Sequence, residues 1–157
     1  MRRKDREVSS FEEIIQIIEK CEVCRLGLSV GNRPYVVPLN FGYEVINGKL
    51  ILYFHGANVG KKLEMIQKNP IACFEVDCDH QLYKHEQAHE FSFEYSSVIG
   101  FGEVQSLTNP TERNHALQKI MQHYTGRADY DLNESTVSRL AILKLEASEI
   151  TGKRNKR

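Results

Sequence analysis

Two adjacent lysines, Lys61 and Lys62, stand where a helix is expected to begin. The first turn of a helix carries unpaired backbone amides and the positive end of the helix dipole, so it favours acidic side chains over lysines. A bound phosphate would reverse that preference, because the amides from Gly60 onward, two ammonium groups and the His55 imidazole could surround it. Gly56 and Gly60 would let the backbone approach closely. On this segment alone the alternative stays open that both lysines project into solvent.

A proline-containing strand is the second candidate binding feature. Val37, Leu39 and Phe41 alternate with Pro38 and Asn40. Because a proline cannot donate to a central ladder, we expect this strand at a sheet edge or a bulge. Unpaired backbone donors and acceptors there could meet a flat heterocycle such as a flavin. The alternative is an edge strand that pairs with a second subunit or with nothing.

Cysteines and histidines raise the question of a metal site. The cysteines are Cys21, Cys24, Cys73 and Cys78, and the histidines that share one polar segment are His80, His85 and His89. The first two cysteines span a junction between a helix and a strand, and the spacing of the other two is loose. No regular element is expected to hold the three imidazoles together. We favour reduced, buried thiols over a zinc site, and a solvated histidine loop over a metal or haem-linked site.

The bulk composition favours one soluble domain over residues 1–157. Hydrophobic residues make up 41 % and charged residues 27 % of the sequence, as in ordinary globular proteins. Lysine plus arginine balance aspartate plus glutamate at 21 each, so no broad positive field would attract nucleic acid or an anionic membrane. No apolar stretch approaches the ~20 residues that span a bilayer, and the charged start of the chain is unlike a signal peptide. We expect a cytoplasmic protein.

Periodic apolar residues predict three helices. Ser10 and Glu13 form a capping-box pattern before a helix that reaches about residue 21. Its inward face would be formed by Phe11, Ile14, Ile15 and Ile18. Asn58 is expected to cap a second helix that stops at the Asn-Pro pair of residues 69–70. Asn109, followed by a proline, opens a third helix over residues 110–124.

Alternating polar and apolar residues predict strands over residues 23–30, 37–45, 50–54, 71–76, 93–107 and 139–145. Asn47-Gly48 is a strong signal for a tight hairpin. Residues 77–90 are polar and lack a clean period, so we expect a loop there. Hairpin links between most strands favour a mainly β fold, a mostly antiparallel barrel with peripheral α-helices, over a doubly wound parallel sheet.

Three motifs carry a resemblance to a known family. They are Arg33-Pro34-Tyr35-Val36-Val37-Pro38-Leu39-Asn40-Phe41, then Tyr53-Phe54-His55-Gly56-Ala57 with Gly60-Lys61-Lys62, then Ser97-Val98-Ile99-Gly100-Phe101-Gly102. In this order and spacing the sequence resembles the nitroimidazole-resistance branch of the pyridoxamine 5'-phosphate oxidase-like flavoproteins. The resemblance covers nearly the whole chain. It favours the phosphate interpretation of Lys61 and Lys62.

The resemblance implies an FMN-binding split β-barrel, and a homodimer with the cofactor in a cleft between the subunits. The residues it implies along the isoalloxazine ring are Val37, Pro38, Leu39, Asn40 and Phe41. Those it implies around the phosphate are His55, Gly60, Lys61 and Lys62. Ser97 would contact the flavin from its strand, with the neighbouring Ser96 as the alternative.

The function that the resemblance implies is an FMN-dependent oxidoreductase that reduces a small organic acceptor, for example a 5-nitroimidazole, with electrons from NAD(P)H or another donor. The sequence identifies no catalytic residue. A flavin- or haem-binding carrier or redox sensor without turnover is the alternative. Vitamin B6 oxidation is disfavoured, because residues 149–154 do not replace the C-terminal substrate-binding segment of pyridoxamine phosphate oxidase proper. Neutral charge argues against a barrel that binds nucleic acid.

Overall fold

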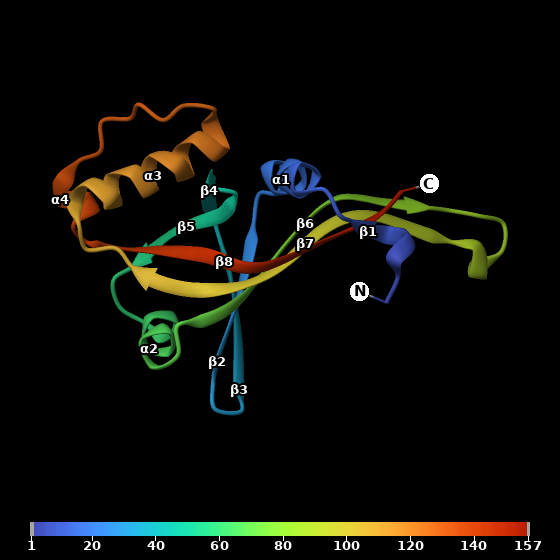
Figure 1. Cartoon of the computed structure of the whole chain (residues 1–157), viewed down its shortest axis with the longest axis horizontal. Coiled ribbons are helices and arrows are strands. Elements are labelled where there is room, and N and C mark those ends of the chain that lie inside the picture. The colour runs from blue at the N-terminus through green and yellow to red at the C-terminus, as the bar shows by residue number, and fades with distance from the viewer. Residues whose placement is uncertain (1, 157) are drawn as a thin grey trace.

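The computed structural model describes residues 2–156 and contains one antiparallel sheet with helices around it (Figure 1). The strands are β1 (Glu7–Val8), β2 (Cys24–Val30), β3 (Arg33–Leu39), β4 (Phe41–Ile46), β5 (Lys49–Ala57), β6 (Ile71–Tyr83), β7 (Ser92–Ser106) and β8 (Leu140–Asn155). The α-helices are α1 (Phe11–Lys20), α2 (Lys61–Lys68), α3 (Pro110–Thr125) and α4 (Glu134–Val137), with short 3-10 helices at Lys4–Arg6 and Ala88–Glu90. The mainly antiparallel β architecture with peripheral helices confirms the predicted fold class.

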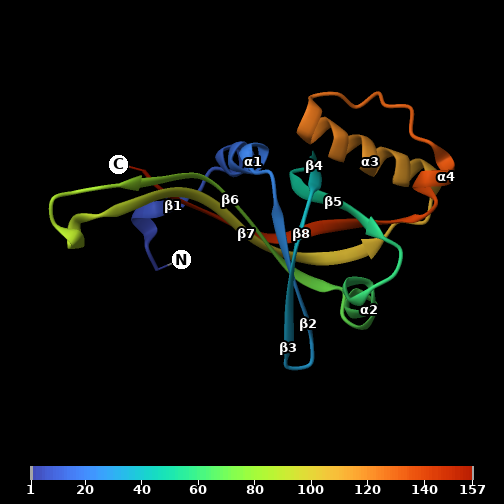
Figure 2. The same ribbon diagram turned by 180° about the vertical axis from the view of Figure 1, so that it is seen from behind.

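The strand order is β3-β2-β6-β7-β8-β5-β4, and β1 pairs with the far part of β8. The outermost strands, β3 and β4, are joined in the chain by Asn40 alone. Two strands at opposite ends of the order can be joined by one residue only if the sheet curls round on itself. Figure 2 shows this curvature from behind, with β4 and β5 beneath α3 and the hairpin of β2 and β3 projecting away from them.

The core has two parts, one on each face of β5. Inside the curled sheet, Leu26, Phe41, Phe54 and Phe74 are fully buried and pack with residues from α1 and α2. On the other face of β5, Ile51 and Tyr53 pack against α3 through the buried side chains of Ala116, Leu117 and Ile120. Successive side chains of a strand point to opposite faces. The side chains of β5 therefore alternate between the interior of the curled sheet and α3 along the rest of the strand.

The helix α1 closes the curled sheet. The Ser10 hydroxyl accepts from the Glu13 amide at 3.3 Å, which confirms the predicted cap. The Glu13 carboxylate does not return to the cap, because it pairs with Arg154 of β8 at 3.0 Å. The buried side chains of α1 are Ile14, Ile17 and Ile18, while Phe11 and Ile15 are half-buried at its margin. This salt bridge ties the helix to the last strand.

Several predicted boundaries shift in the structure. The hairpin of β4 and β5 is confirmed, with Asn47 and Gly48 at φ of 52° and 75°. The predicted loop at residues 77–90 is wrong, because β6 continues to Tyr83 and pairs with β7 beyond an irregularity near Cys78. This hairpin extends past the rest of the molecule (Figure 1), so the end of β6 lacks the alternating burial that would identify a strand from the sequence. The final strand also extends beyond its prediction, to Asn155.

None of the helices in residues 2–156 is both long and apolar enough to cross a membrane.

Candidate functional site

The helix α2 begins one residue after Gly60, whose φ of 127° lies in a region that L side chains rarely adopt. The predicted cap, Asn58, does not cap this helix, and among residues 2–156 no side chain accepts from its first-turn amides. The glycine lets the chain turn sharply into the helix while its carbonyl accepts from the amides of Leu63 and Glu64. The remaining amides of the first turn are open, as at an anion-binding helix start.

Lys62 lies at this helix start and is half-buried. Its Nζ sits directly above Gly56 of β5, where a Cβ would come within 2.7 Å of it. Burial lowers the pKa of the Lys62 ammonium, and within residues 2–156 no carboxylate forms a salt bridge with it. A half-buried cation without an acidic partner is costly unless an anion joins it. The glycine on β5 therefore makes room for a charge that favours an anionic ligand.

Lys61 joins the same region from the exposed side of α2. Its Nζ lies 4.2 Å from the centroid of the Tyr35 ring, a cation–π contact that directs the lysine toward β3. Tyr35, Val37 and Leu39 share one half-buried face of β3. Tyr35 belongs to the first sequence motif but not to the predicted binding residues, although its two-residue spacing from Val37 indicates the shared face.

His55 points away from the two lysines. Because Tyr53 faces α3 and side chains alternate along β5, His55 also faces α3 and Gly56 faces Lys62. The imidazole lines a cavity with side chains of α3, such as Leu117. Burial and the nearby charge of Lys62 lower the pKa of His55. The structure thus puts His55 next to the lysine site but on the opposite face of the strand.

The proline-containing strand β3 lies at a sheet edge and pairs only with β2 among the described strands, as predicted. Val37 and Leu39 are half-buried, while Pro38 and Asn40 are exposed. Phe41 is set apart from these four, because its side chain is fully buried in the core.

Contacts with α3 occupy both the amide and the ring of Phe41. The Phe41 amide donates to the Tyr124 hydroxyl at 3.1 Å, and that hydroxyl donates to the Glu22 carbonyl at 2.5 Å. The His123 ring packs against the Phe41 ring, with centroids 4.5 Å apart. Neither the ring nor the amide of Phe41 is open at the β3 edge.

Ser97 and Ser96 occupy opposite faces of β7. Ser96 is fully buried and donates to Asp79 at 2.9 Å, whereas Ser97 is half-buried on the outer face of the sheet. Gly56 pairs with Ala141 at one end of β8, and Ser97 pairs with Lys153 near the other. The twelve residue steps from Ala141 to Lys153 correspond to about 40 Å along the strand. Within one chain, Ser97 is therefore remote from the lysine site.

The cysteines and the histidine segment form separate local contacts. All four thiols are free, with Cys21 and Cys24 buried. His80 pairs with Asp77 at 2.7 Å, and His85 pairs with Glu90 at 3.3 Å. In the described part of the chain, no three histidine, cysteine or acidic side chains converge as metal ligands would.

Comparison with known proteins gives the family of this chain. The family model for pyridoxamine 5'-phosphate oxidase matches residues 10–154. The chain belongs to this family. No curated protein matches the sequence.

Solved structures of family-like proteins share the fold. A protein of Bacteroides thetaiotaomicron, provisionally assigned to 5-nitroimidazole antibiotic resistance, is 31 % identical, with a TM-score of 0.82 over 94 % of this chain and 86 % of that one. The flavocytochrome Anf3 of Azotobacter vinelandii is 16 % identical, with a TM-score of 0.80 over 100 % and 72 % of the two chains. An FAD- and haem-binding protein of Mycobacterium smegmatis is 18 % identical, with a TM-score of 0.82 over 97 % and 74 %. The curled antiparallel sheet is thus the split barrel of this family, as predicted.

Proposed function

We propose that this chain is an FMN-dependent oxidoreductase that reduces a small organic acceptor. The observation that carries the proposal is Lys62, a half-buried cation that has no carboxylate partner among residues 2–156 and lies over Gly56 beside the open amides of α2. In the proposal, those amides, Lys61 and Lys62 hold the FMN phosphate. The half-buried face and the free edge of β3, around Val37, lie next to this phosphate site and receive the isoalloxazine ring.

The bound FMN would supply electron or hydride transfer, while the protein binds it and tunes its environment. A nitroaromatic acceptor is supported by the 31 % identity to the Bacteroides protein assigned to 5-nitroimidazole resistance. NAD(P)H is the proposed electron donor.

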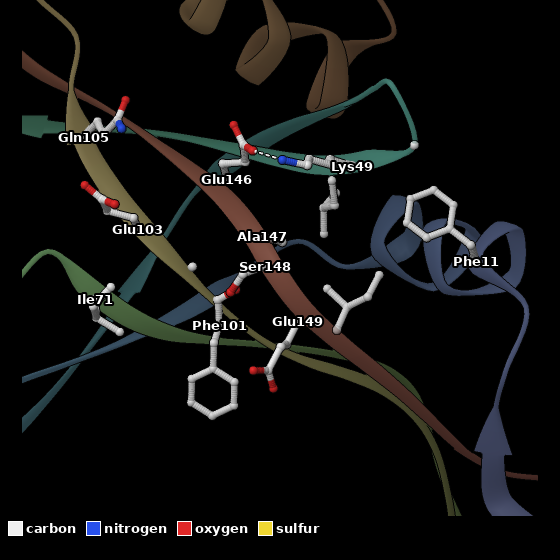
Figure 3. Close-up of a pocket in the computed structure, with 14 residues that line it drawn as sticks. Phe11, Lys49, Ile71, Phe101, Glu103, Gln105, Glu146, Ala147, Ser148 and Glu149 are labelled. Atoms are coloured by element: carbon white, nitrogen blue, oxygen red, sulfur yellow. Dashed lines mark hydrogen bonds and ion pairs between the residues drawn. The ribbon is translucent and has the colours of Figure 1, made fainter.

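A homodimer is part of the proposal, and the outer face of the sheet is its candidate interface. Four large apolar side chains there are 44–62 % exposed, so the rest of residues 2–156 leaves much of each side chain uncovered. They are Val36, Ile71, Ile99 and Phe101. Phe101 and Ile71 both line a groove of about 730 Å³. Figure 3 shows the Phe101 ring projecting away from the strands. Exposed apolar faces of this kind are typical of protein interfaces.

Charges of both signs lie along this outer face. Glu103 and Glu149 line the groove at one end, where Lys49 pairs with Glu146 at 2.6 Å, and Lys153 and Asp77 flank Ser97 toward the other end. A two-fold axis near Ile99 would bring Lys153 of one copy toward Glu149 of the other. A second copy would then bring its own Ser97 toward the lysine site, which one chain alone does not do.

The proposal is tested with freshly purified protein. We expect a flavin absorption spectrum, or uptake of FMN in equilibrium dialysis, and rapid bleaching of the bound flavin by NAD(P)H in anaerobic stopped-flow. Addition of a 5-nitroimidazole should restore the oxidised spectrum. A colourless protein that takes up no FMN would refute the proposal. Bound flavin that no pyridine nucleotide bleaches, and no acceptor reoxidises, would indicate a carrier without turnover.

A further inference from the structure

A cavity of about 280 Å³ lies between β5, α3 and the segment that leads into β8. Its walls are mostly apolar and include Leu117 and Met121 of α3, Val137 of α4 and Leu140 of β8. His55 reaches the cavity from β5. A small apolar pocket with a few polar groups is the usual form of a site for a planar organic ring.

The His55 imidazole is a polar group in this cavity that lacks a hydrogen-bonding partner in the described part of the chain. Its side chain is half-buried, and within residues 2–156 the imidazole forms no hydrogen bond with another residue, although its backbone pairs with β8 opposite Ile142. Because burial lowers its pKa, the imidazole is neutral near pH 7 and offers one donor and one acceptor. A half-buried imidazole among apolar side chains is unfavourable without a hydrogen-bonding partner. A ring with polar edges would provide that partner.

Two further polar side chains line the same cavity. Asp131 offers a carboxylate. The side-chain oxygen of Asn133 accepts from the Thr136 amide at 3.2 Å and from the Ser135 hydroxyl at 2.6 Å, which leaves its NH2 group as a donor. With His55, the cavity therefore carries both donors and acceptors, as the edge of an adenine ring requires.

The strand β5 connects this cavity to the lysine site. Pairing of β5 with β4 stops at Phe54, whereas pairing with β8 continues to Ala57. Residues 55–57 therefore have a free backbone edge on the side of β4. His55 faces the cavity and Gly56 faces Lys62, so the two sites are one residue apart on opposite faces of the strand. Without a side chain at Gly56, a ligand can cross this free edge from one face to the other.

We propose that the cavity binds the adenine ring of a flavin dinucleotide whose phosphates lie at Lys61 and Lys62. The inference rests on the proposed flavin site and extends it, because the site then accepts FAD and binds it more tightly than FMN. The isoalloxazine ring remains along β3, and the adenosine half crosses the free edge of β5 to reach His55. FMN uses the phosphate site alone and leaves the cavity empty.

The test compares FAD and FMN affinities of the full-length protein by fluorescence titration. In the wild type, we expect FAD to bind at least about tenfold more tightly than FMN, the ratio that ~1.4 kcal/mol of additional contact energy produces. Val137→Trp fills the cavity and should bring the FAD affinity to that of FMN, with FMN unchanged. Val45→Trp is the matched control, because Val45 is 42 % exposed on β4 and lines none of these sites.

A second variant and a free nucleoside test the same inference independently, in case Val137→Trp does not fold. His55→Phe keeps a ring of similar shape without its polar atoms, and should reduce the FAD preference while leaving FMN affinity unchanged. Adenosine, which lacks a phosphate, should weaken FAD binding but not FMN binding. Equal wild-type affinities for FAD and FMN, or equal losses of both in the variants, would overturn this inference alone. A wild type that binds neither flavin would overturn the proposed function as well.

Discussion

The contact between Gly56 and Lys62 allows the phosphate site to be tested with a single methyl group. Gly56→Ala would add a Cβ 2.7 Å from the Lys62 Nζ. Ordinary contacts of this kind are about 3.5–4 Å, so the ammonium must move by about 1 Å. The Nζ is the end of a flexible side chain, and alanine suits a strand better than glycine does, so unfolding free energy should change by less than ~1 kcal/mol.

Gly56→Ala should instead lower the affinity for ligands that carry a phosphate. A hydrogen bond to a charged group contributes about 1.5–3 kcal/mol, which corresponds to about 10- to 150-fold in Kd. We expect Gly56→Ala to weaken FMN within this range and to leave riboflavin, which lacks the phosphate, unchanged. Equilibrium dialysis with both ligands measures the two affinities, and urea unfolding checks the fold.

A double-mutant cycle separates the lysine from other effects of the methyl group. Lys62→Met alone should produce a loss of FMN affinity similar to that of Gly56→Ala. The double variant should lose no more than Lys62→Met does, since the methyl group then has no ammonium to displace. If Gly56→Ala weakens riboflavin as much as FMN, or leaves FMN affinity intact, the phosphate assignment is wrong.

Three other predictions concern packing, pH and assembly. Gly42→Ala should lower the unfolding free energy by about 1–3 kcal/mol or more in urea unfolding, because its Cβ would lie 2.4 Å from the backbone of Ile120 in α3. Because the pKa of His55 is lowered in the folded chain, the unfolded chain binds more protons in the pH range just below 6.5. The unfolding free energy should therefore rise with pH through this range, and His55→Phe should reduce this rise in urea titrations. Phe101→Glu should convert the proposed dimer to a monomer in light scattering and weaken FMN; an unchanged mass with the variant would rule out this face as the interface.

Local signals in the sequence predict those elements whose structure depends on a few neighbouring residues. Asn47 and Gly48 adopt the positive φ angles that their hairpin requires. Asn109 caps α3 by accepting from two amides, as its position before a proline indicates. Pro38 lies on an edge strand because a proline cannot serve a central one.

Long-range pairing accounts for what the sequence could not predict. Residues 77–83 are polar, yet they form a strand because β7 pairs with them. Asn58 is a good cap by type, but the chain reaches helical geometry only after Gly60. His55 and Lys62 belong to one motif in the sequence, and only the alternation of β5 between two cores reveals that they face opposite sides. The distance of Ser97 from the lysines likewise depends on the register of β7 and β8.

The single residue between β3 and β4 has a mechanical consequence. Asn40 alone links the outermost strands of the sheet order, and among the described strands β3 pairs only with β2 and β4 only with β5, so no hydrogen-bonded ladder joins these two strands. Local opening of a fold begins where such hydrogen bonding is weakest. A ring seated along β3 would restrain the short link at Asn40, so its binding should slow amide hydrogen exchange in β4 as well as in β3, even though β4 need not touch the ligand. The bound cofactor would then stabilise the closed form of the barrel against local opening.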